Sequence, residues 1–227
     1  GITLYKVGEC VSEGMSIVEA GERKSLLSDI RAALRGLRRA RTSDEIRGYE
    51  GMAARSYFAG VSKLISAAED LMQFSGRNRR PPRDPFNAAL SFGYSLLYRD
   101  MMTATLAVGL DPSFGFFHAA RSAAYPLALD LMELFRTVAW DMPLVASINR
   151  GQWREEHVER SRDQVWLSSA GRRLAIDIYE ARKRETWKHP VLGYSLSYGR
   201  TMELEVRLLE KEWNGTPGLL ARMRIRG

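Results

Sequence analysis

Residues 83–118 have the sequence RDPFNAALSFGYSLLYRDMMTATLAVGLDPSFGFFH, which is expected to contain a long helix together with the signals that start and stop it. Asp84 followed by Pro85 is a strong helix start, because aspartate caps the first turn and proline suits the first helical position. The apolar periodicity of Ala88–Gly109 predicts a long buried helix. Closely spaced glycine and proline residues then predict a turn over residues 109–118.

Similar apolar spacing recurs on both sides of this stretch, so the fold class is expected to be mainly α. Upstream, one helix is expected from Arg23, and its polar side is rich in arginine. A second helix is expected from Ser43 through Phe74, where Thr42 and Glu45 have the spacing of a capping box. Downstream helices are expected over 123–149, with an interruption near Pro143, and over 170–188 and 195–214.

Residues 1–22 lack helical periodicity and contain one candidate strand, Ile2–Val7. A second short strand is expected at Gln164–Leu167. The expected organisation is a connector or remnant over residues 1–22, followed by one helical domain over residues 23–227.

Composition favours a polyanionic partner. The chain of 227 residues carries a net charge of +7, and its basic residues comprise 28 arginines and only six lysines. The planar guanidinium group binds phosphate oxygens in a bidentate manner, which an ammonium group cannot do. Arginine-rich usage in a GC-rich genome is the alternative explanation. With 27% charged and 45% apolar residues, the composition excludes a disordered or membrane-spanning chain.

The sequence predicts a cytoplasmic protein. No stretch has the roughly 20 apolar residues of a membrane helix, and the first 30 residues lack the pattern of a signal peptide. The single cysteine, Cys10, has no partner for an internal disulfide, which fits a reducing compartment.

The strongest chemical signal surrounds His118. Asp130, Glu133 and Asp141 are spaced to share one face of the helix expected after it. Adjacent like charges repel each other unless a cation lies between them, and that cation could be an arginine or a metal ion. Carboxylates with one imidazole suit Mg²⁺ or Mn²⁺ better than a structural zinc ion. The alternative is a solvated helix face beside a histidine in the core.

Other catalytic motifs are missing from the sequence. There is no phosphate-binding loop, no GxGxxG and no zinc-type spacing of cysteine and histidine. The loop SGRNRRPPRD at residues 75–84 instead concentrates arginines around a Pro-Pro pair that no helix interior accommodates.

Four motifs in order resemble one known family, the integrase of CRISPR adaptation called CRISPR-associated protein one. These motifs are RGYEGMAARSYF (47–58), RNRRPPRDPFNAALSFGYSLLY (77–98), GLDPSFGFFH (109–118) and LALDLMELFR (127–136). The resemblance covers about residues 25–215 and implies a helical, metal-dependent catalytic domain. In this family the domain inserts short DNA fragments into a CRISPR array, with the 3′-hydroxyl of the fragment attacking a phosphodiester.

The resemblance also implies a site. The family's metal ligands fall on Glu50, His118 and Glu133, and its supporting aspartate falls on Asp130. Mg²⁺ or Mn²⁺ is the implied cofactor. Spacing alone selected the same residues except Glu50, which Gly48 and Gly51 flank with room for close packing or for DNA.

The arginines expected to hold DNA are Arg77, Arg79, Arg80 and Arg121. For those in the loop, the alternative is a solvated turn. The resemblance implies double-stranded DNA as partner, both the fragment to be inserted and the CRISPR repeat. It also implies a homodimer or higher homo-oligomer, a small ferredoxin-like adaptation protein as a further partner, and no membrane association.

Two departures from the family pattern affect what can be carried over. The usual N-terminal β domain is absent or reduced to a remnant in the first 22 residues, and some relatives are fused behind another domain. Pro126 stands where the family often has serine. An integrase of transposon type and a non-catalytic DNA-binding scaffold remain as alternative functions.

Overall fold

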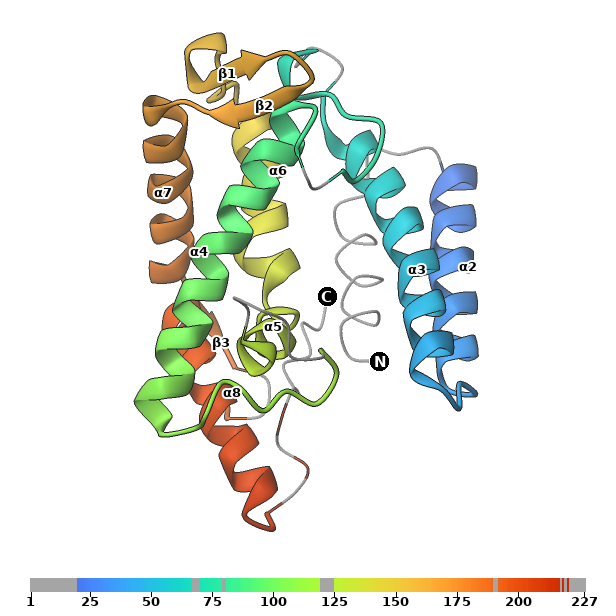
Figure 1. Ribbon diagram of the computed structural model, residues 1–227, viewed down its shortest axis with the longest axis vertical. Coiled ribbons are helices and arrows are strands. Elements are labelled where there is room, and N and C mark those ends of the chain that lie inside the picture. The colour runs from blue at the N-terminus through green and yellow to red at the C-terminus, as the bar shows by residue number, and fades with distance from the viewer. Residues whose placement is uncertain are drawn as a thin grey trace. The chain divides into compact units, whose positions relative to one another are not determined.

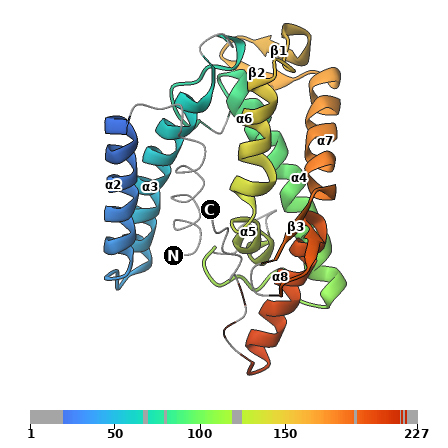
Figure 2. The same cartoon turned by 180° about the vertical axis from the view of Figure 1, so that it is seen from behind.

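A computed structural model describes residues 20–66, 70–78, 81–118, 125–189, 192–216, 218 and 220 of the 227. The helices are α2 (Ala20–Leu37), α3 (Ser43–Leu64), α4 (Pro85–Val108), α5 (Pro126–Met132), α6 (Met142–Asn149), α7 (Ser169–Arg184) and α8 (Tyr198–Trp213). The described residues also contain two 3₁₀ turns, η2 (Asp70–Met72) and η4 (Glu155–His157), and a π-helix, η3 (Arg136–Asp141). The expectation of a mainly α fold is confirmed (Figures 1 and 2).

The described strands form two short hairpins. β1 (Val158–Ser161) pairs with β2 (Gln164–Leu167), and β3 (Thr186–Lys188) pairs with β4 (Ser195–Ser197), both antiparallel. The strand expected at 164–167 is confirmed, whereas the expected Ile2–Val7 strand and Cys10 lie outside the described residues. None of the described helices is long and apolar enough to cross a membrane.

The chain forms two compact units, which are described one at a time. The first consists mainly of residues 1–91 and 144–174, and the second of residues 92–143 and 175–226. The expected division at residue 22 stays a prediction, because residues 1–19 lie outside the described part.

In the first unit, α2 and α3 lie side by side (Figures 1 and 2). Ala33 and Ala53 are fully buried between them, and a side chain at Gly36 would collide with the ring of Tyr49. The predicted capping box at the start of α3 is present, with Glu45 N–H donating to Thr42 Oγ1 at 3.2 Å. Such a cap stabilises a helix by about 1 kcal/mol.

Helix α3 ends earlier than expected. It was predicted to run through Phe74 but stops at Leu64. The side chain of Asn149 explains the stop: its Nδ2 donates to Leu64 O at 2.7 Å, and its Oδ1 accepts from Ser66 N–H at 2.9 Å. These bonds satisfy backbone groups that a helix end leaves without partners.

In the second unit, the centre of the core is Trp140, which packs against Tyr179. A Cβ at Gly93 of α4 would lie 1.9 Å from the indole of Trp140, so only glycine fits at that position. Tyr179 Oη donates to Asp100 Oδ2 at 3.0 Å, and Lys183 Nζ lies 2.7 Å from the same oxygen. Helices α4 and α7 are therefore joined by a hydrogen bond and an ion pair at Asp100, and both contact Trp140.

The two C-terminal helices are shorter than predicted. The segments expected as the end of helix 170–188 and the start of helix 195–214 are instead the strands β3 and β4. Trp187 stacks on Tyr198, and its Nε1 donates to Thr201 Oγ1 at 3.0 Å. These contacts hold the hairpin on α8.

Candidate active site

The turn that leads to His118 begins at Gly109, which has φ +91° and ends helix α4. A glycine adopts this left-handed conformation without the strain that a Cβ would bring. The carbonyl of Pro112 then accepts from Leu127 N–H at 3.0 Å, which ties the turn to the start of α5. Pro126 is the first residue of α5, so proline at the position where the family often has serine fits the helix start.

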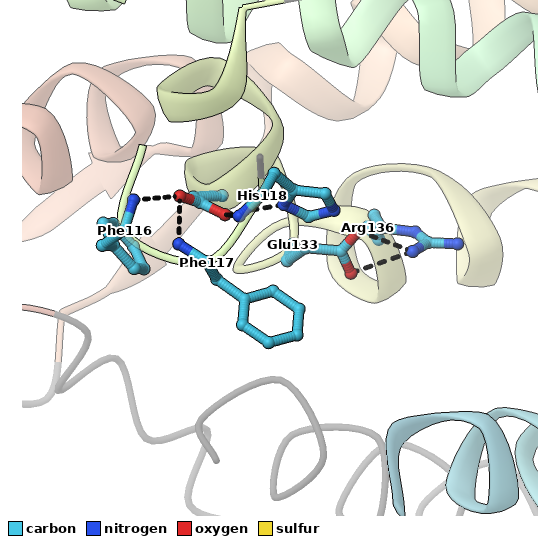
Figure 3. A network of polar contacts seen from close by, with 6 residues as sticks. Phe116, Phe117, His118, Glu133 and Arg136 are labelled. Carbon is cyan, nitrogen blue, oxygen red and sulfur yellow. Dashed lines mark hydrogen bonds and ion pairs between the residues drawn. The ribbon is translucent and has the colours of Figure 1, made fainter. Parts of the chain in front are cut away.

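One buried carboxylate holds the end of this turn (Figure 3). Asp130 Oδ2 accepts from the N–H groups of Phe116 and Phe117 at 2.6 and 3.0 Å, and Oδ1 accepts from His118 N–H at 3.0 Å. A Cβ at Gly115 would lie 2.4 Å from Pro126 Cβ and 2.9 Å from Asp130 Oδ2, so this arrangement requires glycine. Three successive backbone groups are thus fixed around a single side chain.

The same carboxylate orients the imidazole. His118 Nδ1 lies 2.6 Å from Asp130 Oδ1, and the aspartate side chain is only 1% exposed, against 31% for the histidine. Burial raises the pKa of Asp130, but hydrogen bonds from His118 and the backbone N–H groups outweigh it and hold this pKa below its usual range. With Nδ1 bound to Asp130, Nε2 is the ring nitrogen that a metal ion would use, an arrangement common around metal-binding histidines.

Glu133 follows directly after α5, at its C-cap. Its two carboxylate oxygens lie 2.7 and 2.9 Å from Arg136 Nη1 (Figure 3). Arg136 in turn lies over the ring of Tyr94, 4.2 Å from its centroid. Burial lowers the pKa of Arg136, but the interactions with Tyr94, Glu133 and Asp141 raise it by more. The pKa therefore lies above its usual value, and the guanidinium stays charged. Arg136 is therefore a cation of the kind that the row of acids requires.

The acids do not form one regular helical stripe, and that expectation is wrong. Helix α5 ends at Met132, and residues 136–141 form a π-helix, which shifts every later side chain around the axis. Asp141 is consequently only 2% exposed, beneath the surface on which Glu133 lies. The predicted interruption near Pro143 corresponds to the change from the π-helix to α6 between Asp141 and Met142, and a further break lies at residues 133–135.

Glu50 lies on α3 in the first unit, whereas His118, Asp130 and Glu133 lie in the second. A Cβ at Gly48 or Gly51 would meet no described atom within 4 Å, so close approach of another backbone or of DNA at these glycines stays a prediction. Within the described residues, no three His, Cys, Asp or Glu side chains gather into a metal-binding group. Glu50 as a metal ligand stays a prediction.

The donor set nevertheless fits a divalent cation. His118 supplies an oriented imidazole, and Glu133 supplies two carboxylate oxygens, which a metal ion would share with Arg136 Nη1. One imidazole with carboxylates is a ligand set that Mg²⁺ and Mn²⁺ accept.

The basic loop at 75–84 is organised around Asn87. The side chain of Asn87 donates to Gly76 O at 2.9 Å and to Asp84 Oδ2 at 2.8 Å, and its Oδ1 accepts from Arg77 Nη1 at 2.7 Å and from Asn78 N–H at 3.2 Å. Arg77 also donates to Ser91 Oγ at 3.1 Å. Its guanidinium thus supports the loop internally, and its contact with DNA stays a prediction. Arg79, Arg80 and Arg121 lie outside the described residues.

Neither Arg136, the partner of Glu133, nor Tyr94, the ring under Arg136, was expected from the sequence. Arg136 follows Glu133 by three positions, a spacing at which side chains of a helix meet, so this signal was present. The role of Tyr94 had no such signal, because its position over Arg136 depends on how α4 packs.

Comparison with known proteins places these features in a family. Residues 14–181 match the family of the CRISPR associated protein Cas1. The chain is 52% identical over 205 residues to the CRISPR-associated exonuclease Cas4/endonuclease Cas1 fusion of Leptospira interrogans, which covers 90% of this chain and 38% of the relative.

Two solved structures share the fold. A CAS1 protein from Thermotoga maritima is 26% identical, with a TM-score of 0.80, over 94% of this chain and 65% of that chain. A casposase bound to an integration product is 25% identical, with a TM-score of 0.80, over 100% of this chain and 63% of that chain.

Fold and site together define a mainly helical protein with an aspartate-held histidine beside a glutamate. The chain belongs to the Cas1 family. It spans 38% of the length of the Leptospira relative.

Proposed function

We propose that the chain carries the catalytic domain of a metal-dependent DNA integrase and endonuclease of CRISPR adaptation. In the proposed reaction, a DNA 3′-hydroxyl attacks a phosphodiester of the array. One P–O bond forms to the incoming 3′-oxygen, another breaks, and the cut array strand keeps a free 3′-hydroxyl. Family membership supports this class of reaction, and the endonuclease named in the Leptospira relative agrees with it.

The observation that carries the proposal is the His118–Asp130 pair. A 2.6 Å contact, backed by three backbone hydrogen bonds to the same carboxylate, fixes both the tautomer and the direction of the imidazole. A solvated helix face with a histidine in the core would not need such an arrangement.

Each residue has a proposed task. His118 through Nε2, Glu133 and Glu50 would hold the metal ion, and Asp130 positions His118. Arg136 keeps the Glu133 carboxylate in one orientation by binding both its oxygens. A Mg²⁺ or Mn²⁺ ion bound there would polarise the phosphate and stabilise the attacking and leaving oxygens. Arg79, Arg80 and Arg121, with Arg77, would bind backbone phosphates.

The test is strand transfer of a labelled DNA duplex into a supercoiled plasmid that carries a CRISPR repeat, with Mg²⁺, with Mn²⁺ and with chelator. We expect joined product only with metal, and its loss in His118→Ala. His157→Ala is the matched control, because the ring of His157 also forms a hydrogen bond through Nδ1, accepting from Arg154 N–H at 3.0 Å, but its partner is not a carboxylate. Joining that is unaffected by chelator would contradict the proposal.

Glu50 needs its own test because it lies in the first unit. We expect Glu50→Ala to abolish strand transfer while duplex binding stays intact. An equal loss of DNA binding and strand transfer would remove Glu50 from the catalytic set.

A transposon-type integrase is the second candidate, and the similarity to the casposase over the whole chain favours considering it. Plasmids with and without the repeat separate the two, because the CRISPR activity is expected to depend on the repeat. A DNA-binding scaffold would bind the duplex but join nothing under any condition.

The proposed partners are the duplex to be inserted, the CRISPR repeat, further copies of this chain and a small ferredoxin-like protein. Light scattering on the purified chain tests self-association. Adding the ferredoxin-like protein to the strand-transfer reaction tests whether it is required.

A further inference from the structure

Three arginines form a row along α2, and we call Arg31, Arg35 and Arg38 the α2 arginine ridge. All three are exposed. Arg31 and Arg35 lie on α2, and Arg38 continues its last turn, where its N–H donates to Leu34 O at 3.2 Å. None of the three forms an ion pair with any residue in the described part of the chain.

The ridge lies away from the face that packs on α3. The packed face carries Ile30 and Ala33, which are 1% and 0% exposed, and the arginines follow a different side of the helix. Positions 31, 35 and 38 are spaced by four and three residues, so the side chains leave the helix about 6 and 4.5 Å apart along its axis. The three side chains therefore leave the backbone along a line about 10 Å long.

This row does little for the fold itself. Like charges at these spacings repel each other, and only the groups in the last turn gain from the negative end of the helix. Three other exposed arginines, in contrast, face carboxylates: Arg200 and Arg207 bind Glu203, and Arg160 binds Glu155. The ridge is a concentration of positive charge that lacks an internal partner among the described residues.

The chemistry of the ridge selects the partner. It has no aromatic or large apolar side chain that could form the dry centre of a protein interface. Guanidinium groups bind phosphate oxygens in a bidentate manner, and a strand of DNA offers a regular row of phosphates. The basic turn that follows the ridge, with exposed Arg39 and Arg41, extends the same charge.

We propose that the α2 arginine ridge binds the phosphate backbone of duplex DNA, independently of base sequence and outside the catalytic residues. This rests on the proposed function, which makes DNA the substrate, and it adds a holding surface beyond the loop arginines. In this role the ridge increases affinity without touching the reacting phosphodiester.

The experiment measures affinity for a fluorescent DNA duplex of mixed sequence over a range of salt concentrations. The test variant is Arg31→Gln/Arg35→Gln/Arg38→Gln, in the full chain. The control is Arg160→Gln/Arg200→Gln/Arg207→Gln, which removes the same net charge from three exposed but ion-paired arginines. Circular dichroism and thermal melting verify that both variants fold.

If each ridge arginine binds one phosphate, the slope of log affinity against log salt flattens by about 2.7, and affinity at low salt falls about tenfold or more. The control is expected to keep the native slope. An unchanged slope in the ridge variant overturns the proposal, and so does an equal change in the control. If the ridge variant keeps the native slope for DNA but no longer binds an acidic protein that the native chain binds, the proposal is overturned. The ridge then belongs to an interface with that class of protein.

Failure of the proposed function gives a different result. In that case the native chain itself would not bind the duplex, or would bind it and never join it with metal present. If the native chain binds and joins DNA but the ridge variant matches it, only the ridge is wrong.

Discussion

Two loops of the molecule are fixed by the same device but with opposite results. The loop ending at His118 is held by Asp130, and the loop at 75–84 is held by Asn87. In each, a buried polar side chain on the first or second turn of a helix binds several groups of the loop. A carboxylate accepts only, so it draws N–H donors and one imidazole nitrogen toward a single negative charge. An amide both donates and accepts. Asn87 therefore donates to two oxygens of the loop and accepts from Asn78 N–H and from Arg77.

We call Asp130 with its hydrogen bonds the Asp130 clamp, and Asn87 with its hydrogen bonds the Asn87 clamp. The charged and the neutral side chain fix their loops in ways that differ chemically. The Asp130 clamp orients the imidazole of His118 through Nδ1. The Asn87 clamp uses a guanidinium to support the loop. Four variants test this difference between the two clamps.

The largest effect is expected for Asp130→Ala, which removes four hydrogen bonds around one site. We expect a loss of about 3 kcal/mol of stability, because three backbone N–H groups lose their acceptor. Strand transfer should fall by roughly 100-fold, since the residue that orients the imidazole is lost. Thermal melting and the strand-transfer assay measure both. Asp111→Ala is the control, because Asp111 accepts only one local hydrogen bond, from Ser113 N–H at 2.8 Å. Equal losses of stability and of strand transfer in the two variants would contradict the proposed role of Asp130 in holding the turn and orienting His118.

Asn87→Ala is expected to lower stability by about 2 kcal/mol, because a fully buried amide leaves several partners unsatisfied. Urea denaturation measures this loss. The comparison predicts that Mn²⁺ binding, followed by electron paramagnetic resonance, is unchanged in this variant. A loss of Mn²⁺ binding as large as that of Asp130→Ala would contradict the distinction between the clamps.

Acid should weaken the charged clamp and spare the neutral one. The pKa of Asp130 is lower in the folded chain than in the unfolded one, so folding favours its ionised form. Its contribution to stability is therefore complete above about pH 4 and is lost as the pH falls through the lower folded-state pKa. Urea unfolding of the native chain and of Asp130→Asn should differ most near neutral pH and converge in acid. A difference in stability that grows in acid would contradict a lower pKa of Asp130 in the folded chain.

The smallest effect is expected for Arg77→Lys. An ammonium group cannot bind Asn87 and Ser91 together, so we expect a loss of about 1 kcal/mol in urea denaturation. The positive charge remains, so the salt dependence of DNA binding should not change. Weaker DNA binding with native stability would instead assign this side chain to DNA.

Helices with strong local signals could be predicted from sequence. The start of α4 at Pro85 and the capping box of α3 are examples, because each depends on residues a few positions apart. The end of α3 could not be predicted, because the stop at Leu64 depends on Asn149, which is distant in the sequence. β3 and β4 were hidden for the same reason: Trp187 pairs with Leu196 across the hairpin, and helical spacing cannot reveal a cross-strand pair.

The geometry around the predicted site residues could not be foreseen from the sequence, and metal binding by these residues stays a prediction. The resemblance supplied His118, Asp130 and Glu133, and spacing supported them. That Asp130 collects three backbone N–H groups depends on the folded turn. The π-helix at 136–141 also violates the regular period on which the acidic stripe was based.

Gly115 carries a consequence for laboratory evolution of this protein. Any side chain there meets Pro126 and Asp130, whereas the neighbouring Phe114 and Phe116 are 71% and 61% exposed. A saturation library across the turn should therefore tolerate many residues at 114 and 116 but return only glycine at 115. Variants selected from such a library can therefore differ at the residues on either side of Gly115, whereas Gly115 itself is expected to be retained.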